Sequence, residues 1–137
     1  MGIKNGKCFF CYCPISIESN QVTTCDIDHF IPLSMQFNSK HDLDLNGVWN
    51  LVLSCQDCNR GETNGKFARL PEDYLLQRLY KRNDYLIESN HPLKETIIMR
   101  TGKNPQQRAN YLNVMYGFAE SLSRAKWKPQ IERDIGF

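Results

Sequence analysis

The sequence has no apolar run long enough to span a membrane, no internal repeat and no low-complexity segment. A membrane-spanning helix needs about 20 consecutive apolar residues, so we expect no contact with a membrane. Residues 1–5 also lack the apolar stretch of a signal peptide. We therefore expect a cytoplasmic protein in a reducing compartment. There, the six cysteines indicate metal ligation rather than disulfide bonds.

The chain also lacks a strong net charge, because its 137 residues carry a net charge of only +2. The charge is unevenly distributed, because residues 1–65 carry −3, residues 66–128 carry +6 and the last nine residues carry −1. A basic segment that follows an acidic one suits a metal centre next to a phosphate-binding surface. A solvated helical surface rich in Lys and Arg would give the same pattern, so charge leaves both interpretations open.

The length favours one domain with an appendage, and the composition is that of an ordinary globular protein. The character of the chain changes near residue 66. Before it, turn-forming and β-branched residues alternate with cysteines, whereas helical patterns dominate after it. We predict an α+β fold with a small core at residues 1–66 and a helical extension of about three helices at residues 67–137.

Within the first part, residues 6–14 are predicted to form a tight turn, or knuckle, and residues 22–29 a strand. Residues 34–47 are polar and typical of a loop, and residues 49–54 contain a short apolar run that fits a buried strand. Residues 55–66 are predicted to form a second knuckle followed by a short helix. Gly61 and Gly65 would make that helix irregular.

Three later segments each begin with a proline, which is tolerated at the first position of a helix. They are residues 71–89, 92–100 and 105–126. We expect Asn104 to cap the third helix and Gly102 to end the second. Four side chains of the third helix share one stripe and are expected in the core rather than on a binding surface: Tyr111, Met115, Phe118 and Leu122.

Two Cys-x-x-Cys pairs suggest a zinc site: Cys8 with Cys11, and Cys55 with Cys58. Each pair can place two sulfurs on one side of an ion, and two pairs complete a tetrahedral Cys₄ site. The alternative is four buried free cysteines with a coincidental spacing. Cys13 would be a poorer substitute for Cys11. Like Cys25, Cys13 is more often a small buried apolar residue.

Between the pairs lies the dipeptide Asp28-His29, and Asn59 follows the second pair. A carboxylate and an amide supply oxygen ligands for Mg²⁺ or a similar ion, and imidazole exchanges protons near neutral pH. Neighbouring strand residues point to opposite faces, so Asp28 and His29 share a site only if the strand ends or twists there. Pro32 favours such an ending. Taken alone, His29 would more often be a structural histidine.

Three motifs follow one another in the chain: Cys8-x-x-Cys11, then Asp28-His29-Phe30-Ile31-Pro32-Leu33-Ser34, then Trp49-Asn50-Leu51-Val52-Leu53-Ser54-Cys55-x-x-Cys58-Asn59-Arg60-Gly61. In this order they closely resemble the HNH endonucleases, and more narrowly the zinc-knuckle branch of that family. The resemblance covers residues 8–66. It implies a ββα-metal fold, with two antiparallel strands, a long loop and a helix around one catalytic ion.

The resemblance implies a metal-dependent endonuclease that hydrolyses DNA. His29 would be the general base, Asp28 and Asn59 would hold a catalytic Mg²⁺ or Mn²⁺, and Asn50 would brace the loop that carries His29. Asn59 stands where the family name has its last histidine, a variant that also occurs in the HNH domains of RNA-guided nucleases. Asp26 would either support the metal ligands or be a surface acid.

Three basic residues close to the metal ligands are predicted to grip nucleic-acid phosphates: Arg60, Lys66 and Arg69. Family members nick or cut DNA in restriction, homing, phage packaging and defence. Two alternatives stay open. One is a non-catalytic, zinc-stabilised nucleic-acid-binding module. The other is a nuclease subunit that is active only beside an ATPase, helicase or guide-bearing partner, with residues 67–137 as the docking surface.

Overall fold

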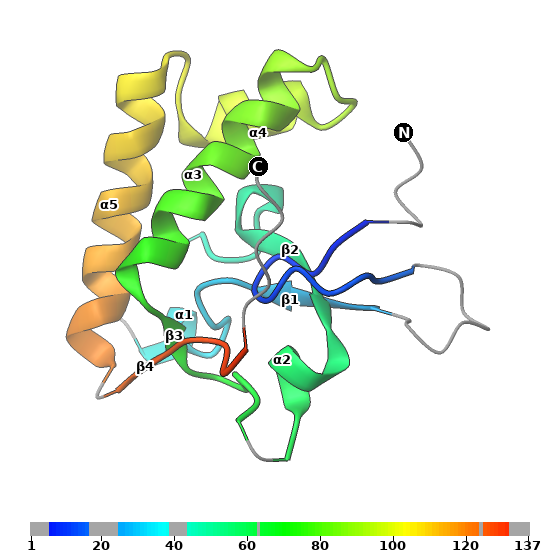
Figure 1. Cartoon of the computed structure of the whole chain (residues 1–137). Coiled ribbons are helices and arrows are strands. Elements are labelled where there is room, and N and C mark those ends of the chain that lie inside the picture. Colours follow the sequence, from blue (N-terminus) through cyan, green and yellow to red (C-terminus); the bar gives the residue numbers. More distant parts are fainter. Residues whose placement is uncertain (1–5, 17–24, 39–43, 63, 124, 132–137) are drawn as a thin grey trace. The chain divides into compact units, whose positions relative to one another are not determined.

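The computed structural model describes residues 6–16, 25–38, 44–62, 64–123 and 125–131 (Figure 1). The chain forms two compact units. The knuckle unit contains the described parts of residues 1–28, 52–67 and 127–137, and the helical unit contains those of residues 29–51 and 68–126. The predicted division into a core at residues 1–66 and a helical extension at residues 67–137 stays a prediction.

The first sheet consists of two paired strands, and a helix follows the second of them. Strand β1 (Cys25–His29) pairs with β2 (Leu51–Cys55), and helix α2 (Gln56–Arg60) follows β2 directly. Val52 and Ser54 are buried on β2 while their neighbours are partly exposed, which is the alternation of a half-buried strand. This ββα order, together with the helices that follow, confirms the predicted α+β class. Residues 22–24, the predicted start of the first strand, lie outside the described residues.

The amino-terminal knuckle has the tight turn that its sequence predicted. Lys7 and Pro14 form an antiparallel bridge, and the Cys8 N–H donates to the Cys13 carbonyl at 2.8 Å. Tyr12 closes the turn with a positive φ of 67°. The Phe9 N–H then donates to the Leu53 carbonyl at 2.9 Å, which attaches the knuckle to β2.

One aromatic residue near the carboxyl end completes the packing of the knuckle unit. The fully buried ring of Phe10 meets the Trp127 ring edge to face, with 5.1 Å between the ring centroids. The Trp127 indole N–H donates to the Asn64 carbonyl at 2.8 Å. Strand β4 (Lys126–Trp127), which contains this tryptophan, pairs with β3 (Leu70–Pro71) in a second small sheet.

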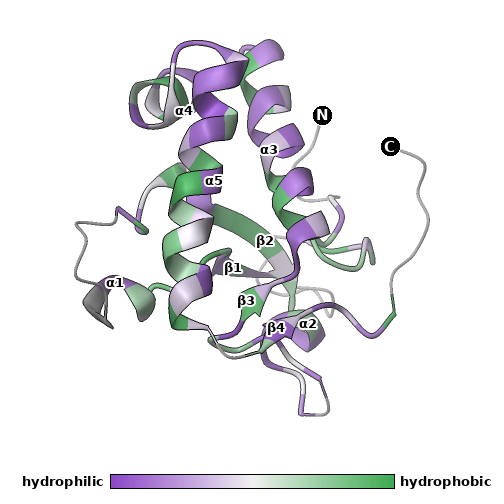
Figure 2. Ribbon diagram, turned by 90° about the vertical axis from the view of Figure 1, so that its left-hand side faces the viewer, coloured by the Kyte–Doolittle hydropathy of each residue, from purple (hydrophilic) through white to green (hydrophobic). Residues whose placement is uncertain are grey.

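The helical unit is built on α3 (Asp73–Glu88), α4 (Lys94–Thr101) and α5 (Pro105–Leu122), which pack against one another pairwise. Figure 2 shows that hydrophobic and hydrophilic residues alternate along these helices, as expected where one face is buried. The buried apolar side chains come from all three: Leu75, Leu76, Leu79, Ile87, Ile97, Leu112, Met115, Tyr116 and Ala119.

Helix boundaries follow the predicted signals in part. The Asn104 side chain accepts the Gln107 N–H at 2.8 Å and caps α5, and Gly102 ends α4 with a φ of 141°. Helix α3 starts at Asp73 instead of residue 71, because Pro71 belongs to β3. Helix α5 stops at Leu122, which is 39% exposed and therefore is not part of the core stripe.

The segment predicted as a loop, residues 34–47, contains one short helix, and a second short helix follows it. Helix α1 (Met35–Asn38) lies within it, and the 3₁₀ helix η2 (Val48–Asn50) leads into β2. Residues 39–43 of this segment lie outside the described residues. Among the helices of the described segments, none combines the length and the apolar character needed to cross a bilayer.

Candidate functional site

Four cysteines of the knuckle unit converge on one point. The sulfurs of Cys8, Cys11, Cys55 and Cys58 all lie within 4.8 Å of one another. The first two come from the amino-terminal knuckle, and the other two come from the end of β2 and from α2. Cys8, Cys11 and Cys58 are buried, and Cys55 is half-buried. Four clustered sulfurs are a structural metal site of the kind that zinc occupies.

The proton distribution in this quartet also suits a cation. The pKa of Cys11 lies far below the ordinary value of a thiol, because its sulfur accepts hydrogen bonds from Cys55, Cys58 and Cys8. The pKa of Cys58 lies far above it, because the sulfurs of Cys11, Cys55 and Cys8 share its proton. Four neighbouring thiolates repel one another when the protons that they share are removed. A divalent ion in place of those protons cancels the repulsion, so the donor set fits zinc.

The remaining two cysteines are not members of this quartet. Cys13 and Cys25 are both half-buried. Burial, followed by the neighbouring Cys11, raises the pKa of Cys13 to about 11. Burial also raises the pKa of Cys25. The alternative ligand set that replaces Cys11 with Cys13 is therefore not the one that the structure brings together.

A carboxylate of β1 holds the side chains at the end of α2. Asp26 Oδ2 accepts a hydrogen bond from the Asn59 amide nitrogen at 3.0 Å. The same oxygen lies 3.1 Å from Arg60 Nε, and the guanidinium also donates to Asp26 Oδ1 at 3.4 Å. Because the amide nitrogen of Asn59 faces Asp26, its carbonyl oxygen is the atom that can serve as a metal ligand.

Asp28 faces a lysine that has no exposed surface. Lys66 Nζ lies 3.1 Å from Asp28 Oδ2, and the exposed fractions of the two side chains are 0% and 11%. Burial lowers the pKa of Lys66, and the charge of Asp28 opposes that shift. Lysine is rarely buried without a partner, so this ion pair fixes both side chains. The sequence had predicted that Lys66 binds a nucleic-acid phosphate, and it did not predict the contact of Lys66 with Asp28.

The two arginines predicted beside Lys66 differ from it in burial. The Arg60 side chain is 58% exposed although it contacts Asp26. Arg69, in the helical unit, is exposed as well. Both guanidinium groups are therefore accessible to a phosphate, and their predicted role in nucleic-acid binding stays a prediction.

His29 ends β1 and has an amide partner, Asn46, within the same unit. Its Nε2 lies 2.9 Å from Asn46 Oδ1. The strand ends here because Phe30 and Ile31 form a bend, as Pro32 had suggested. Sequence reasoning did not find Asn46. The available signal was the Asn46-Gly47 pair, which is typical of a tight turn and so places the amide at a fixed position.

Asn50 has no exposed surface and uses both ends of its amide. Its Oδ1 accepts the Ile31 N–H at 2.8 Å. Its Nδ2 donates to the carbonyls of Ile31 at 3.0 Å and Leu45 at 2.8 Å. Its own carbonyl accepts the Phe30 N–H at 2.7 Å. These bonds tie the chain after His29 to the turn that carries Asn46, which is what a brace for the His29 loop requires.

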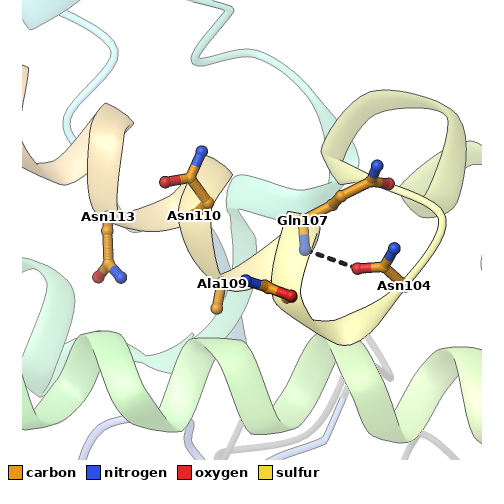
Figure 3. A pocket seen from close by; sticks show the side chains of 6 residues that line it. Asn104, Gln107, Ala109, Asn110 and Asn113 are labelled. Carbon is orange, nitrogen blue, oxygen red and sulfur yellow. Dashed lines mark hydrogen bonds between the residues drawn. The ribbon is translucent and has the colours of Figure 1, made fainter.

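A shallow hollow on the helical unit lies along the first turns of α5 (Figure 3). Its lining consists almost entirely of amide side chains: Asn104, Gln106, Gln107, Ala109, Asn110 and Asn113. None of the predicted catalytic, metal-binding or nucleic-acid-binding residues belongs to it.

A family model matches part of this chain. Residues 8–66 match a family model described as HNH endonuclease, and this segment contains the cysteine quartet, β1, β2 and α2. Comparisons with the curated proteins and with the solved structures gave no match. The family consists of nucleases, so a nucleic acid is the class of substrate that it implies. Residues 8–66 of this chain are therefore similar to the HNH endonuclease family.

Proposed function

We propose that this chain is a metal-dependent endonuclease that hydrolyses DNA phosphodiester bonds. The observation that carries the proposal is the order of the side chains within the segment that matches the family. Asp28 and His29 are consecutive at the end of β1, and Asn59 is hydrogen-bonded to Asp26 of the same strand. A carboxylate, an imidazole and an oriented amide are the groups that such hydrolysis needs.

His29 is the proposed general base. The carbonyl oxygen of Asn46 can only accept a hydrogen bond, so Nε2 of His29 carries the proton in this contact. Nδ1 is then the unprotonated ring nitrogen. It takes a proton from the attacking water, and Asn46 holds the ring in the tautomer that allows this.

Asp28 and the amide oxygen of Asn59 are the proposed ligands of a catalytic Mg²⁺ or Mn²⁺. Both are hard oxygen donors, which such ions prefer. When bound, the ion supplies charge stabilisation at phosphorus and at the leaving 3′ oxygen. Lys66 fixes one oxygen of Asp28, and Asp26 fixes the nitrogen of Asn59, so both ligands are oriented before an ion arrives.

The sizes of the catalytic contributions show how much of the rate acceleration each group can supply. A positioned general base contributes roughly 10²–10⁴-fold to the rate. Enzymes typically lower the barrier by about 8–23 kcal/mol, of which that factor supplies only about 3–5 kcal/mol. The larger share therefore falls to cationic groups around the phosphate, and the exposed guanidinium of Arg60 is the proposed protein contribution.

Zinc is the proposed occupant of the cysteine quartet, with a structural role. The quartet joins the amino-terminal knuckle to β2 and α2. A bound ion therefore fixes α2, which carries Asn59, and β2, whose partner strand β1 carries Asp26 and Asp28. All four protein ligands are sulfur, which leaves no open position for a catalytic water.

A plasmid-cleavage assay tests the proposal. With Mg²⁺ or Mn²⁺, we expect nicked or linear DNA with 5′-phosphate and 3′-hydroxyl ends, and no product with EDTA. His29→Ala should abolish detectable cutting while zinc content and DNA binding stay near those of the parent. Full-speed cleavage by that variant would eliminate His29 as the base.

The same assay separates the two alternatives. DNA binding without cleavage in every metal would indicate a non-catalytic binding module, although such a module has no need of Asp28, His29 and Asn59 together. If the pure chain is silent but cuts in a mixture with an ATPase, helicase or guide-bearing partner, it is a subunit of a larger nuclease, with residues 67–137 as the predicted docking surface.

A further inference from the structure

Phe67 is an aromatic residue whose placement the packing of the fold does not explain. It follows Lys66 directly, its side chain is 58% exposed, and its φ is 51°. A left-handed backbone is strained for a residue with a bulky side chain, and glycine would adopt it without that strain. A strained backbone at this position therefore carries a phenyl ring that is exposed to solvent.

Three backbone hydrogen bonds hold this strained residue in place. The Phe67 N–H donates to the Asn59 carbonyl at 2.9 Å, and the Lys66 N–H donates to the Cys58 carbonyl at 2.5 Å. One residue earlier, the Gly65 N–H donates to the Gly61 carbonyl at 2.9 Å. The backbone of residues 65–67 thus lies against the end of α2, and the backbone of Phe67 is directly beside Asn59, the proposed metal ligand.

Side chains add to this anchoring. The Lys66 side chain is fully buried on Asp28. Gly65 has no room for a larger residue, because a Cβ there would lie 2.5 Å from the Gly61 nitrogen. The backbone that carries Phe67 is therefore anchored. A ring on an anchored loop needs little further ordering of the backbone when it binds a flat ligand.

The unit already uses other rings for its core. Phe10 and Trp127 are buried and pack edge to face, whereas Phe67 is exposed. Next to Asn59 in the sequence, Arg60 presents a guanidinium that is 58% exposed. A cation for the phosphate and an aromatic face for the base are the two elements of single-strand recognition.

We propose that Phe67 is a stacking platform for an unpaired base that adjoins the phosphate to be cut. The substrate is then single-stranded DNA or a duplex with a locally unpaired base, because a base inside an intact stack has no free face. This inference rests on the proposed function and adds to it the class of DNA that the site accepts.

The test measures binding rather than cutting. All variants carry His29→Ala, so that DNA is bound but not consumed. Single-stranded oligonucleotides with 2-aminopurine at successive positions are titrated, and a blunt duplex of the same sequence is the comparison. Phe67→Ala should weaken single-strand binding by roughly 5- to 100-fold. It should also abolish the stacking-induced quenching of 2-aminopurine, and change duplex binding less than about 2-fold.

Three further variants complete the test. Phe67→Trp restores binding and quenching, whereas Phe67→Leu, which is apolar but not aromatic, does not. Tyr85→Ala removes another exposed ring, 55% exposed and in the helical unit, and should leave both DNA affinities unchanged. Zinc content and the melting temperature of each variant show that the proteins are folded.

The outcomes separate this inference from the proposed function. If the parent binds and cuts DNA but Phe67→Ala binds single strands as the parent does, the stacking role is wrong and the nuclease stands. Equal losses for single strand and duplex, or full rescue by Phe67→Leu, would also overturn the stacking role. If the parent neither binds nor cuts any DNA, the proposed function fails and the stacking role fails with it.

Discussion

Replacing Asn50 with alanine tests whether one buried amide supports the loop that carries His29. Asn50 is fully buried, and its side chain makes hydrogen bonds to the N–H and carbonyl of Ile31 and to the carbonyl of Leu45. Asn50→Ala removes all three bonds at once. It also leaves one backbone donor and two backbone acceptors buried without these partners.

The cost follows from those three groups. A buried polar group left unsatisfied costs about 1–3 kcal/mol, so three groups give about 3–6 kcal/mol after partial relaxation. Typical domains have a total stability of about 5–15 kcal/mol, so the loss is a large part of it. Each kcal/mol corresponds to about 3–4 °C for a chain of this size, and we expect the melting temperature to fall by about 10–20 °C.

Urea and thermal unfolding measure this effect, and the fluorescence of Trp49, the preceding residue, reports the local change. Asn50→Asp keeps an acceptor for the Ile31 N–H but places a carboxylate against two carbonyls, so it should be at least as destabilising. Asn113→Ala, an exposed asparagine on α5, is the matched control and should stay within about 0.5 kcal/mol of the parent. A loss below about 1 kcal/mol for Asn50→Ala would refute the role of this amide as a brace.

Four further predictions concern the metal site and the two unexpected contacts. Cys58→Ala should lose zinc and unfold the amino-terminal half, because a structural zinc contributes about 10–16 kcal/mol; a cooperative melt at the parent temperature would contradict this. In the parent, zinc affinity should fall as the pH falls, because the ion must displace the protons of the thiols, and the neighbouring sulfurs raise the pKa of Cys58. A metal-release titration measures this pH dependence. Lys66→Met should destabilise the chain by about 3–5 kcal/mol because it removes the charge that pairs with the Asp28 carboxylate, and Asp28→Asn combined with Lys66→Met should recover most of that loss; equal stability of all three proteins in urea would show that the pair contributes nothing. Asn46→Ala should lower kcat more than it changes KM and mix the two tautomers of His29 in ¹⁵N NMR spectra, whereas an unchanged tautomer would show that Asn46 does not orient the ring.

The parts of the fold that depend on neighbouring residues could be predicted from the sequence. The two Cys-x-x-Cys turns, the Asn104 cap and the glycine that ends α4 are local signals, and the structure has each of them. The cysteine quartet also joins residues far apart in the chain. It was predictable because a tetrahedral zinc site needs two such pairs.

Features set by distant partners could not be predicted in this way. Pro71 looked like the first residue of a helix, but it lies in β3, whose partner strand is Lys126–Trp127. That same pairing shortens α5, since Lys126 is extended. The contact of Lys66 with Asp28 was equally hidden, because lysine is among the residues least expected to be buried.

The contacts of amides were hidden for another reason. Asparagine is common in polar loops, and its sequence context does not reveal which backbone groups it will meet. Asn50 was identified only through the family resemblance, and Asn46 was not identified at all. Hydrogen-bond partners of this kind depend on the path of the loop, which local propensity does not determine.

The contact of Trp127 with Phe10 and Asn64 has a consequence for how the protein is made. A ribosome adds Trp127 long after Phe10, because the two residues are far apart in the sequence. A nascent polypeptide therefore lacks the indole that packs against the ring of Phe10 until residue 127 has been added. Products truncated between these two residues would lack that contact, so premature termination there should yield aggregation-prone fragments.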